Sequence, residues 1–227
     1  MTPRIAILIS GRGSNMVAIA RQVHGGALAG RCEIAAVISS RPNAPGLAMA
    51  RELGLETLAL DARGMGRDAY DDALLAALEQ CRAEVVVLAG YMRILSPRVV
   101  ARYRGRILNI HPADTAAHQG LGGYTWAFAQ KLPSTKITVH LVDEGLDTGA
   151  VLAQREVDLR GADTLAEVER RGLAIEHELY PEALKGFLHE FGVQGSGFKV
   201  RNPVHPAILS SPADSSSLNS EPRTLRS

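Results

Sequence analysis

The stretch that decides the fold is Ile5-Ala-Ile-Leu-Ile9-Ser-Gly-Arg-Gly-Ser-Asn15. Its first five residues are continuously apolar, which is typical of a strand that is buried on both faces of a parallel sheet. Two glycines then allow a tight turn, and residues 15–23 carry apolar side chains at helical spacing. The stretch therefore predicts a strand, a turn and a helix, the unit from which open α/β folds are built.

The same unit recurs along the chain. Apolar runs of strand length alternate with segments of helical spacing. The strand candidates are residues 5–9, 34–38, 57–60, 85–89 and 107–110, and the helix candidates are residues 15–23, 46–53, 66–81 and 97–103. This alternation predicts an α/β fold with an open, mostly parallel Rossmann-like sheet and helices on both of its faces.

The pattern changes after Ile110. Residues 112–124 are polar and contain glycine, and residues 136–142 and 150–159 then alternate between apolar and polar side chains. Such alternation indicates half-exposed strands that close the sheet in antiparallel fashion. A capping box, Thr164-Leu-Ala-Glu167, begins a long helix, which Pro181 is expected to kink or restart.

Length and composition predict one domain over residues 1–190 of the 227, followed by a poorly ordered Gly/Ser/Pro-rich tail over residues 191–227. Lys and Arg total 25 against 24 acidic residues, so there is no broad positive field for nucleic acid. The N-terminal apolar run is too short for a signal peptide or a membrane span. Cys32 and Cys81 form no zinc or disulfide pattern, which favours a reducing, cytoplasmic setting.

Three motifs carry candidate chemistry. The turn Ser10-Gly-Arg-Gly-Ser-Asn15 places free backbone N–H groups at a helix start, which suits a phosphate, although glycines needed only for the turn explain it equally well. Asn109-Ile-His-Pro112 ends a strand where open α/β sheets bind ligands. Residues two apart in a strand face one side, so Asn109 and His111 can converge, although a structural histidine is the competing interpretation.

The third motif is Asp143-Glu-Gly-Leu-Asp-Thr-Gly149, which joins the two late strands. It is composed of ordinary turn residues and is compatible with a solvated acidic turn. Asp147 lies between Leu146 and Thr148-Gly149, a setting that can hold a carboxylate inward beside an imidazole. We expect that carboxylate to raise the pKa of His111 and to help relay a proton.

Four blocks together resemble the phosphoribosylglycinamide formyltransferase family, in its order and at about its spacing, over residues 3–190. They are Gly11-x-Gly13-Ser14-Asn15, Val86-Val-Leu-Ala-Gly-Tyr-Met-Arg-Ile-Leu-Ser96, Leu108-Asn-Ile-His-Pro112 and Val139-His-Leu-Val-Asp-Glu-Gly-Leu-Asp-Thr-Gly149. The resemblance implies transfer of a formyl group from 10-formyltetrahydrofolate to the amine of glycinamide ribonucleotide in de novo purine biosynthesis, without a metal. It implies small-molecule substrates and no membrane or nucleic-acid partner, and the chain is expected to be a monomer or homodimer.

The resemblance also implies site residues. The catalytic group is Asn109, His111 and Asp147, which stabilise a tetrahedral intermediate and move the proton. The ribonucleotide and its phosphate are implied to meet Gly13, Ser14, Asn15, Gly90, Met92 and Pro112. The folate is implied to meet Arg93, Ile94, Leu95, Val142, Asp143 and Glu144.

The chain departs from the family pattern on the acceptor side of the site. Ala113-Asp-Thr-Ala116 replaces Ser-Leu-Leu-Pro, Gly122-Gly123 replaces His-Thr, and Lys136-Ile137 replaces small residues. The usual C-terminal strand and its substrate-binding Glu are not recognisable after Phe191. His118 is interpreted as a solvated loop residue, His140 as a packed histidine near the site, and Trp126 as a core or partner-facing residue.

Alternative functions remain open from the sequence. Formyltetrahydrofolate deformylases and methionyl-tRNA formyltransferases share the Asn-x-His and Asp positions, so a hydrolase that releases formate is one alternative. A folate- or nucleotide-binding relative with impaired catalysis is another. A pyridine-nucleotide dehydrogenase is disfavoured, because the first turn lacks GxGxxG and no acidic residue ends the second strand.

Overall fold

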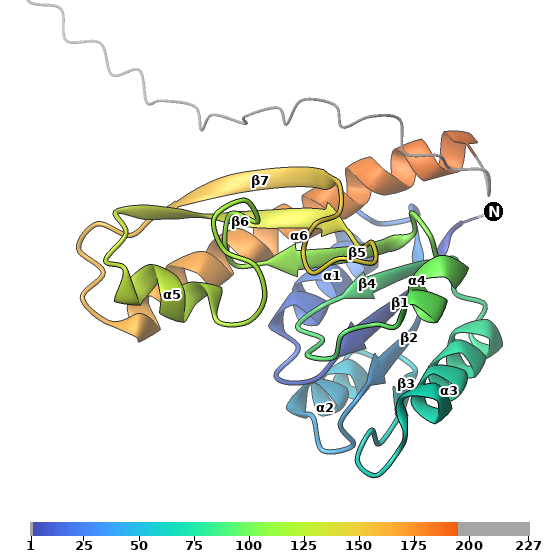
Figure 1. Cartoon of the computed structure of the whole chain (residues 1–227). Helices are drawn as coiled ribbons and strands as arrows, with labels where there is room; N and C mark the ends of the chain where they lie inside the picture. The colour runs from blue at the N-terminus through green and yellow to red at the C-terminus, as the bar shows by residue number, and fades with distance from the viewer. Residues whose placement is uncertain (1, 195–227) are drawn as a thin grey trace, which may run out of the picture.

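The computed structural model describes residues 2–194. Seven strands form one sheet in the order β3-β2-β1-β4-β5-β6-β7 (Figure 1). The strands are β1 (Arg4–Ile9), β2 (Glu33–Ser39), β3 (Thr57–Ala59), β4 (Val85–Leu88), β5 (Ile107–His111), β6 (Ser134–Leu141) and β7 (Val151–Asp158). Strands β1 to β5 pair in parallel, whereas β6 pairs antiparallel with both β5 and β7. The predicted fold class is confirmed.

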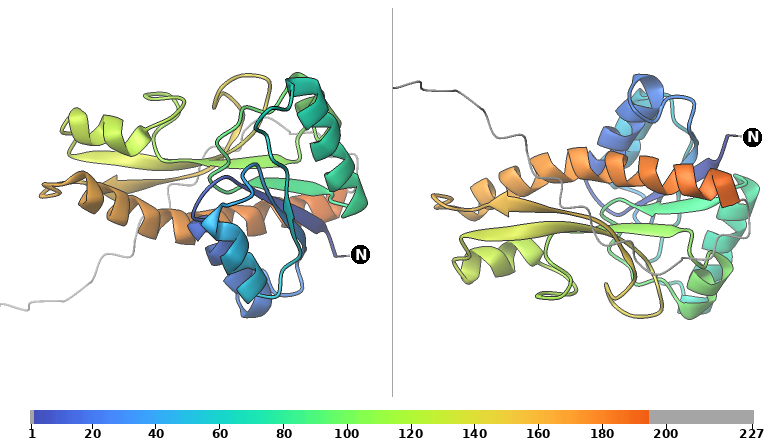
Figure 2. Two further views of the ribbon diagram at one scale, coloured as in Figure 1. Left: turned by 90° about the horizontal axis from the view of Figure 1, so that it is seen from below. Right: turned by 90° about the horizontal axis from the view of Figure 1, so that it is seen from above.

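Helices cover both faces of the sheet. They are α1 (Ser14–Gly25), α2 (Pro45–Glu52), α3 (Arg67–Gln80), α4 (Pro97–Arg102), α5 (Gly123–Ala129) and α6 (Leu165–Gln194). One hydrophobic cluster joins a face of the sheet to α1, α2, α5 and α6, and a second joins the other face to α3 and α4. Figure 2 shows the long helix α6 running along the sheet.

The apolar run of β1 explains these two layers. Ile5, Ile7 and Ile9 belong to the first cluster, and Ala6 and Leu8 belong to the second. All five side chains are buried, as expected for a central strand that is covered on both faces. The continuous hydrophobicity of the sequence therefore reflects two separate cores on either side of one strand.

Helix α6 does not restart at Pro181. The proline lies inside one helix from Leu165 to Gln194. Buried side chains on both sides of the proline, including Leu179 and Leu184, belong to the hydrophobic cluster on one face of the sheet. The predicted cap is present, since Thr164 Oγ1 accepts from the Glu167 N–H at 3.2 Å.

Residues 191–194 of the predicted tail belong to α6, and residues 195–227 lie outside the described residues. Within residues 2–194, no helix is both long and apolar enough to span a membrane.

The strand order creates a crevice beside β1. Strands β1 and β4 are neighbours, and the chain winds from β1 toward β3 on one side and from β4 toward β7 on the other. Open α/β sheets bind ligands at the carboxyl ends of strands at such a reversal. Two loops meet there, because the Ser10 N–H donates to the Gly90 carbonyl at 3.1 Å and Ser10 Oγ accepts from the Met92 N–H at 2.9 Å.

Candidate active site

Asn109 and His111 lie at the carboxyl end of β5, beside the antiparallel strand β6. Both side chains contact the same carboxylate, that of Asp147. Asn109 Nδ2 lies 3.3 Å from Asp147 Oδ1, and His111 Nδ1 lies 3.4 Å from Asp147 Oδ2. The structure thus brings together the three residues that the sequence proposed as catalytic.

Asp147 reaches this position because of its loop. Asp143 Oδ1 accepts from the Gly145 N–H at 3.0 Å and from Thr148 Oγ1 at 2.6 Å, which fixes the turn between β6 and β7. Asp147 itself has a φ of 54°, in the left-handed region that residues other than glycine rarely adopt. Its side chain is only 9% exposed. Strained backbone of this kind occurs at functional sites, where the surrounding contacts hold it in place.

The Asp147 carboxylate has four neighbours. Besides Asn109 and His111, His140 Nε2 lies 3.3 Å from Oδ1, and the Gly120 N–H donates to Oδ2 at 2.8 Å. Burial alone raises the pKa of Asp147, but the hydrogen bonds from His140 and Gly120 and the charges of both histidines outweigh it. The pKa of Asp147 is therefore lowered to about 2, and the group is a carboxylate at neutral pH.

The imidazole of His111 is oriented from both sides. Its Nε2 lies 2.9 Å from the His118 carbonyl oxygen. Because a carbonyl can only accept, Nε2 carries a proton and donates it. The other nitrogen, Nδ1, faces the Asp147 carboxylate, so the gap between Nδ1 and Oδ2 is suited to one further proton.

Two opposing effects act on the pKa of His111. Burial lowers the pKa, and this effect exceeds the opposing influence of Asp147 and of the His118 carbonyl, so the net direction is below the ordinary value of 6.5. Asp147 does raise the pKa of His111, as the sequence predicted, but a side chain that is only 4% exposed loses more through desolvation. Burial of the imidazole therefore outweighs the attraction of the carboxylate.

Two contacts to Asp147 were not predicted. The alternation along β6 placed His140 near the site as a packed histidine, and it is packed, with Nδ1 donating to the Leu141 carbonyl at 2.8 Å. Its reach to Asp147 depends on the register in which His140 pairs with Asn109. Gly120 contributes only its backbone N–H. A backbone contact of this kind cannot be recognised from the residue types in a sequence.

His118 is not a solvated loop residue, contrary to the prediction. It is half-buried, and its ring stacks on Trp126 with centroids 4.8 Å apart and an interplanar angle of 10°. Its Nε2 lies 3.2 Å from the Leu121 carbonyl. The aromatic contact excludes water from one ring face, and the His118 backbone carbonyl directly orients His111.

The glycine-rich turn lies on the other side of the crevice. Gly13 has a φ of 77°, and a Cβ there would lie 3.0 Å from the Cα of Gly46, so the turn requires glycine for both reasons. Helix α1 then begins at Ser14, whose side chain is half-buried. Unpaired N–H groups of a first helical turn can bind an anion.

The side chain of Asn15 points inward. Its Nδ2 donates to the carboxylate of Glu176 on α6, which also accepts from the Tyr124 hydroxyl on α5. Asn15 is 6% exposed, and its Oδ1 has no hydrogen-bond partner within the part of the chain that the structure describes. Burial raises the pKa of Glu176 despite both donors. The sequence did not single out Glu176 or Tyr124, whose contact joins segments far apart in the chain.

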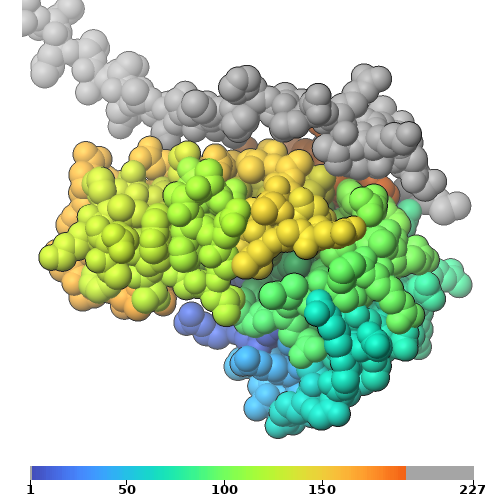
Figure 3. All heavy atoms as spheres, viewed as in Figure 1, coloured from blue at the N-terminus to red at the C-terminus, as the bar shows by residue number. Residues whose placement is uncertain are grey.

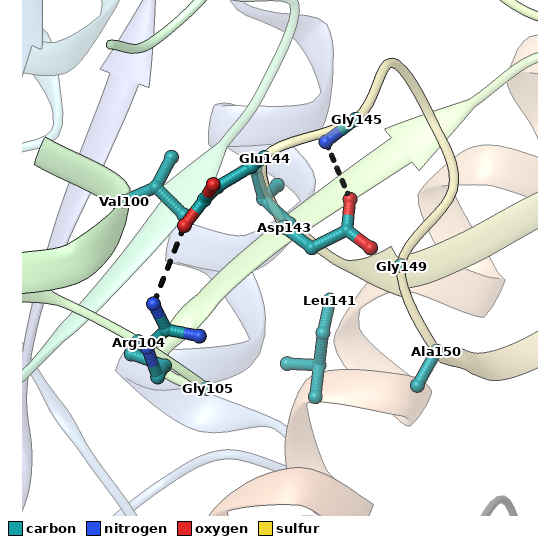
Figure 4. A pocket seen from close by; sticks show the side chains of 10 residues that line it. Val100, Arg104, Gly105, Leu141, Asp143, Glu144, Gly145, Gly149 and Ala150 are labelled. Atoms are coloured by element: carbon teal, nitrogen blue, oxygen red, sulfur yellow. Dashed lines mark hydrogen bonds and ion pairs between the residues drawn. The ribbon is translucent and has the colours of Figure 1, made fainter. Parts of the chain in front are cut away.

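The residues implied for folate line two cavities. Arg93, Ile94 and Leu95 line one of about 480 Å³, where the Arg93 guanidinium lies 4.2 Å from the centre of the Tyr70 ring. Val142, Asp143 and Glu144 line another of about 690 Å³ (Figure 4). Figure 3 shows this face hollowed beneath the yellow segment around residue 145.

Apolar side chains remain exposed around the site. Ile94 is 76% exposed and Leu121 is 77% exposed, and Met92, Leu146 and the Gly90 backbone are also accessible. Pro112 is half-buried directly after His111. Exposed apolar groups beside buried polar ones are typical of a site that binds an organic ligand.

An amide, two imidazoles and a buried carboxylate converge on an open α/β sheet, beside the carboxyl end of β5. Residues 3–184 match the family described as Formyl transferase. The chain belongs to the formyl transferase family.

Similar proteins share its architecture and much of its length. A phosphoribosylglycinamide formyltransferase of Haemophilus influenzae is 35% identical over 185 residues, which are 81% of this chain and 86% of the relative. A trifunctional purine biosynthetic protein, adenosine-3, of Drosophila melanogaster is 35% identical over 80% of this chain, which spans 14% of that relative. The crystal structure of a glycinamide ribonucleotide transformylase 1 from Symbiobacterium toebii is 37% identical, with a TM-score of 0.80 over 83% of this chain and 89% of that one.

Proposed function

We propose that the chain transfers the formyl group of 10-formyltetrahydrofolate to the amine of glycinamide ribonucleotide, a step of purine biosynthesis. The observation that carries the proposal is the buried Asp147 carboxylate, with Asn109, His111 and His140 all within 3.4 Å. The names of the similar proteins support the acceptor, and membership of the formyl transferase family implies a folate-type formyl donor.

The chemistry begins with attack of the acceptor amine on the formyl carbon. A carbon–nitrogen bond forms, the carbonyl electrons move onto oxygen, and a tetrahedral intermediate results. Asn109 Nδ2 and His111 are the donors assigned to that oxygen, because fixed donors at a site of developing charge lower the barrier. Reaching the oxygen through Nε2 requires His111 to exchange its bond to the His118 carbonyl for a bond to the intermediate.

The amine must lose a proton and the departing folate nitrogen must gain one. The Nδ1 of His111 and the carboxylate of Asp147 are assigned to hold the proton between these events, since they lie 3.4 Å apart and Asp147 is ionised at neutral pH. The carbon–nitrogen bond to folate then breaks, the carbonyl reforms, and the proton passes to the leaving nitrogen. Protons and electron pairs balance without a further reactant.

The ligands are assigned to opposite sides of this centre. Gly13, Ser14 and Asn15 are assigned to the ribonucleotide phosphate, with Gly90, Met92 and Pro112 along the nucleotide. Arg93, Ile94, Leu95, Val142, Asp143 and Glu144 are assigned to the folate. The two cavities support the folate assignment, and Met92 lines the cavity of Arg93, Ile94 and Leu95, where the two ligands would meet.

We further propose a cytoplasmic location, and a monomer or homodimer as the working state. Cys32 and Cys81 are free thiols, which suits a reducing compartment. Light scattering at the assay concentration measures the oligomeric state directly.

The test of function is consumption of 10-formyltetrahydrofolate, followed by absorbance with and without glycinamide ribonucleotide. The proposal predicts consumption only when the acceptor is present. Consumption at one rate in both samples identifies a hydrolase instead. No consumption in either sample at high protein concentration identifies a relative that binds without catalysing.

A further inference from the structure

Two departures from the family pattern, 22 positions apart in the chain, meet in space. Asp114 lies in the loop after β5, where the family has an apolar residue, and Lys136 lies in β6, where the family has a small one. Lys136 Nζ donates to Asp114 Oδ2 at 2.7 Å. The two departures therefore contact each other directly.

Asp114 is also tied to its own loop and to β7. Its Oδ1 accepts from the Ala116 N–H at 3.1 Å and from Gln154 Nε2 at 3.3 Å. The same amide donates to Thr138 Oγ1 at 2.9 Å, and that hydroxyl donates to the Ala113 carbonyl at 2.7 Å. The start of the loop is therefore bound to two neighbouring strands.

The backbone of Asp114 then shapes the turn that reaches the catalytic pair. Its carbonyl accepts from the Ala117 and His118 N–H groups, each at 2.9 Å. This turn presents the His118 carbonyl to His111 Nε2. Two residues further on, the Gly120 N–H donates to Asp147. The loop thus supplies one backbone contact to each member of the His111–Asp147 pair.

A third departure fits the same arrangement. Gly123, the first residue of α5, stands where the family has Thr, and a Cβ at this position would lie 2.6 Å from the Pro112 carbonyl oxygen. Only glycine allows the end of the loop to approach Pro112 so closely. The Asp114–Lys136 pair at the start of the loop and Gly123 at its end therefore fit the same path of the loop.

We propose that Asp114 and Lys136 form a clamp that positions loop 113–123 and, through it, the His111–Asp147 pair. The effects on kcat and KM that this proposal predicts rest on the proposed function. Asp114 and Lys136 are positioning residues, since they touch the loop rather than the reacting atoms. Their side chains are 25% and 46% exposed, so the pair adds little to global stability, and its removal acts on geometry instead.

Three single variants and one double variant test the clamp. Asp114→Asn and Lys136→Met each remove the ion pair, whereas Lys136→Arg keeps it. We expect the first two to lower kcat on the order of tenfold with each KM within about threefold, because small displacements of catalytic groups cost rate. Lys136→Arg is expected to retain wild-type kcat, and Asp114→Asn/Lys136→Met to be no slower than the slower single variant.

Hydrogen exchange at residues 117–123 is the readout that does not need activity. The clamp predicts faster exchange of the Gly120 amide, on the order of tenfold, in Asp114→Asn and Lys136→Met, with unchanged exchange in β1 and β4. Asp61→Asn, which breaks an exposed ion pair to Arg63 after β3, at the opposite edge of the sheet from β6 and β7, is the matched control and should change nothing. If Asp114→Asn fails to fold, Lys136→Met still tests the clamp, because it leaves the sequence of loop 113–123 unchanged.

The outcomes separate the two proposals. An inactive wild-type protein overturns the proposed function, while the exchange data still judge the clamp. If the wild type transfers formyl and both ion-pair variants keep its kcat and its Gly120 exchange, the clamp is wrong. A rate loss in Lys136→Arg equal to that in Lys136→Met also overturns it.

Discussion

Asp147 is the residue on which the site depends. It is held inward by a left-handed backbone conformation and is surrounded by four hydrogen-bonding groups. Such a carboxylate cannot be replaced by its amide without loss, because an amide neither holds a negative charge nor accepts on both sides. The first two predictions follow from this.

Asp147→Asn is expected to lower kcat by about 10²- to 10³-fold, the range of general acid–base catalysis, with KM for the formyl donor changed by less than about threefold. Steady-state kinetics with each substrate varied in turn measures both. Asp163→Asn, which changes an exposed carboxylate in the loop between β7 and α6, is the control. Near-normal kcat in Asp147→Asn contradicts the assigned proton transfer.

The second prediction concerns pH. Because the pKa of His111 lies below 6.5, the neutral imidazole predominates at pH 7, and kcat/KM is expected to fall only as the pH drops through that lowered pKa. Asp147 raises the pKa of His111, so Asp147→Asn is expected to move it lower still. An NMR titration of the His111 ring measures this shift. A higher pKa in the variant contradicts the electrostatic account.

At this scale the sequence predicted that Asn109, His111 and Asp147 would lie together, but not all of their contacts. The convergence of Asn109 and His111 followed from the period of a strand. The stacking of His118 on Trp126 and the pairing of Asp114 with Lys136 did not, because each depends on the path of loop 113–123. Loop paths are set by long-range contacts rather than by local pattern.

Among the elements, α6 is the one that ties the site to the sheet. Tyr180 is fully buried, and its hydroxyl contacts the carbonyls of Leu88 and Leu108, each at 3.0 Å. These carbonyls belong to the last residue of β4 and to the residue before Asn109 in β5. The Tyr180 hydroxyl therefore links α6 to β4 and β5.

Tyr180→Phe is expected to lower the free energy of unfolding by about 1–3 kcal/mol, since it leaves buried carbonyls without this donor. Urea denaturation followed by circular dichroism measures the change. Because the ring is retained, little packing is lost and the fold should persist. An unchanged free energy of unfolding means that the hydroxyl carries no stabilising contact.

The sequence predicted the elements well, because buried parallel strands are continuously apolar and need no tertiary information to be recognised. The antiparallel end of the sheet was also expected, from the alternation in residues 136–142 and 150–159. For α6 the sequence left open whether Pro181 kinks or restarts the helix. The helix continues through the proline, with buried side chains packed on the sheet on both sides of it.

At the scale of the whole molecule, the two hydrophobic clusters formed by residues 2–194 lie within residues 5–191, and the sequence predicts a poorly ordered tail after them. We therefore expect a chain that ends at Gln194 to unfold at the same midpoint temperature as the full chain, within about 2 °C, by analogy with substitutions outside a core. Differential scanning calorimetry of both chains measures this. A large fall in midpoint contradicts the domain boundary expected from the sequence.

The central claim is that formyl transfer takes place at the His111–Asp147 pair. The most direct measurement follows ¹³C-labelled formyl from 10-formyltetrahydrofolate by NMR, with glycinamide ribonucleotide present, for the wild type and Asp147→Asn. The wild type is predicted to move the label into the amide of the acceptor, with none in free formate, and the variant to do so at least about a hundredfold more slowly. Label that appears as formate, or a variant as fast as the wild type, would contradict the claim.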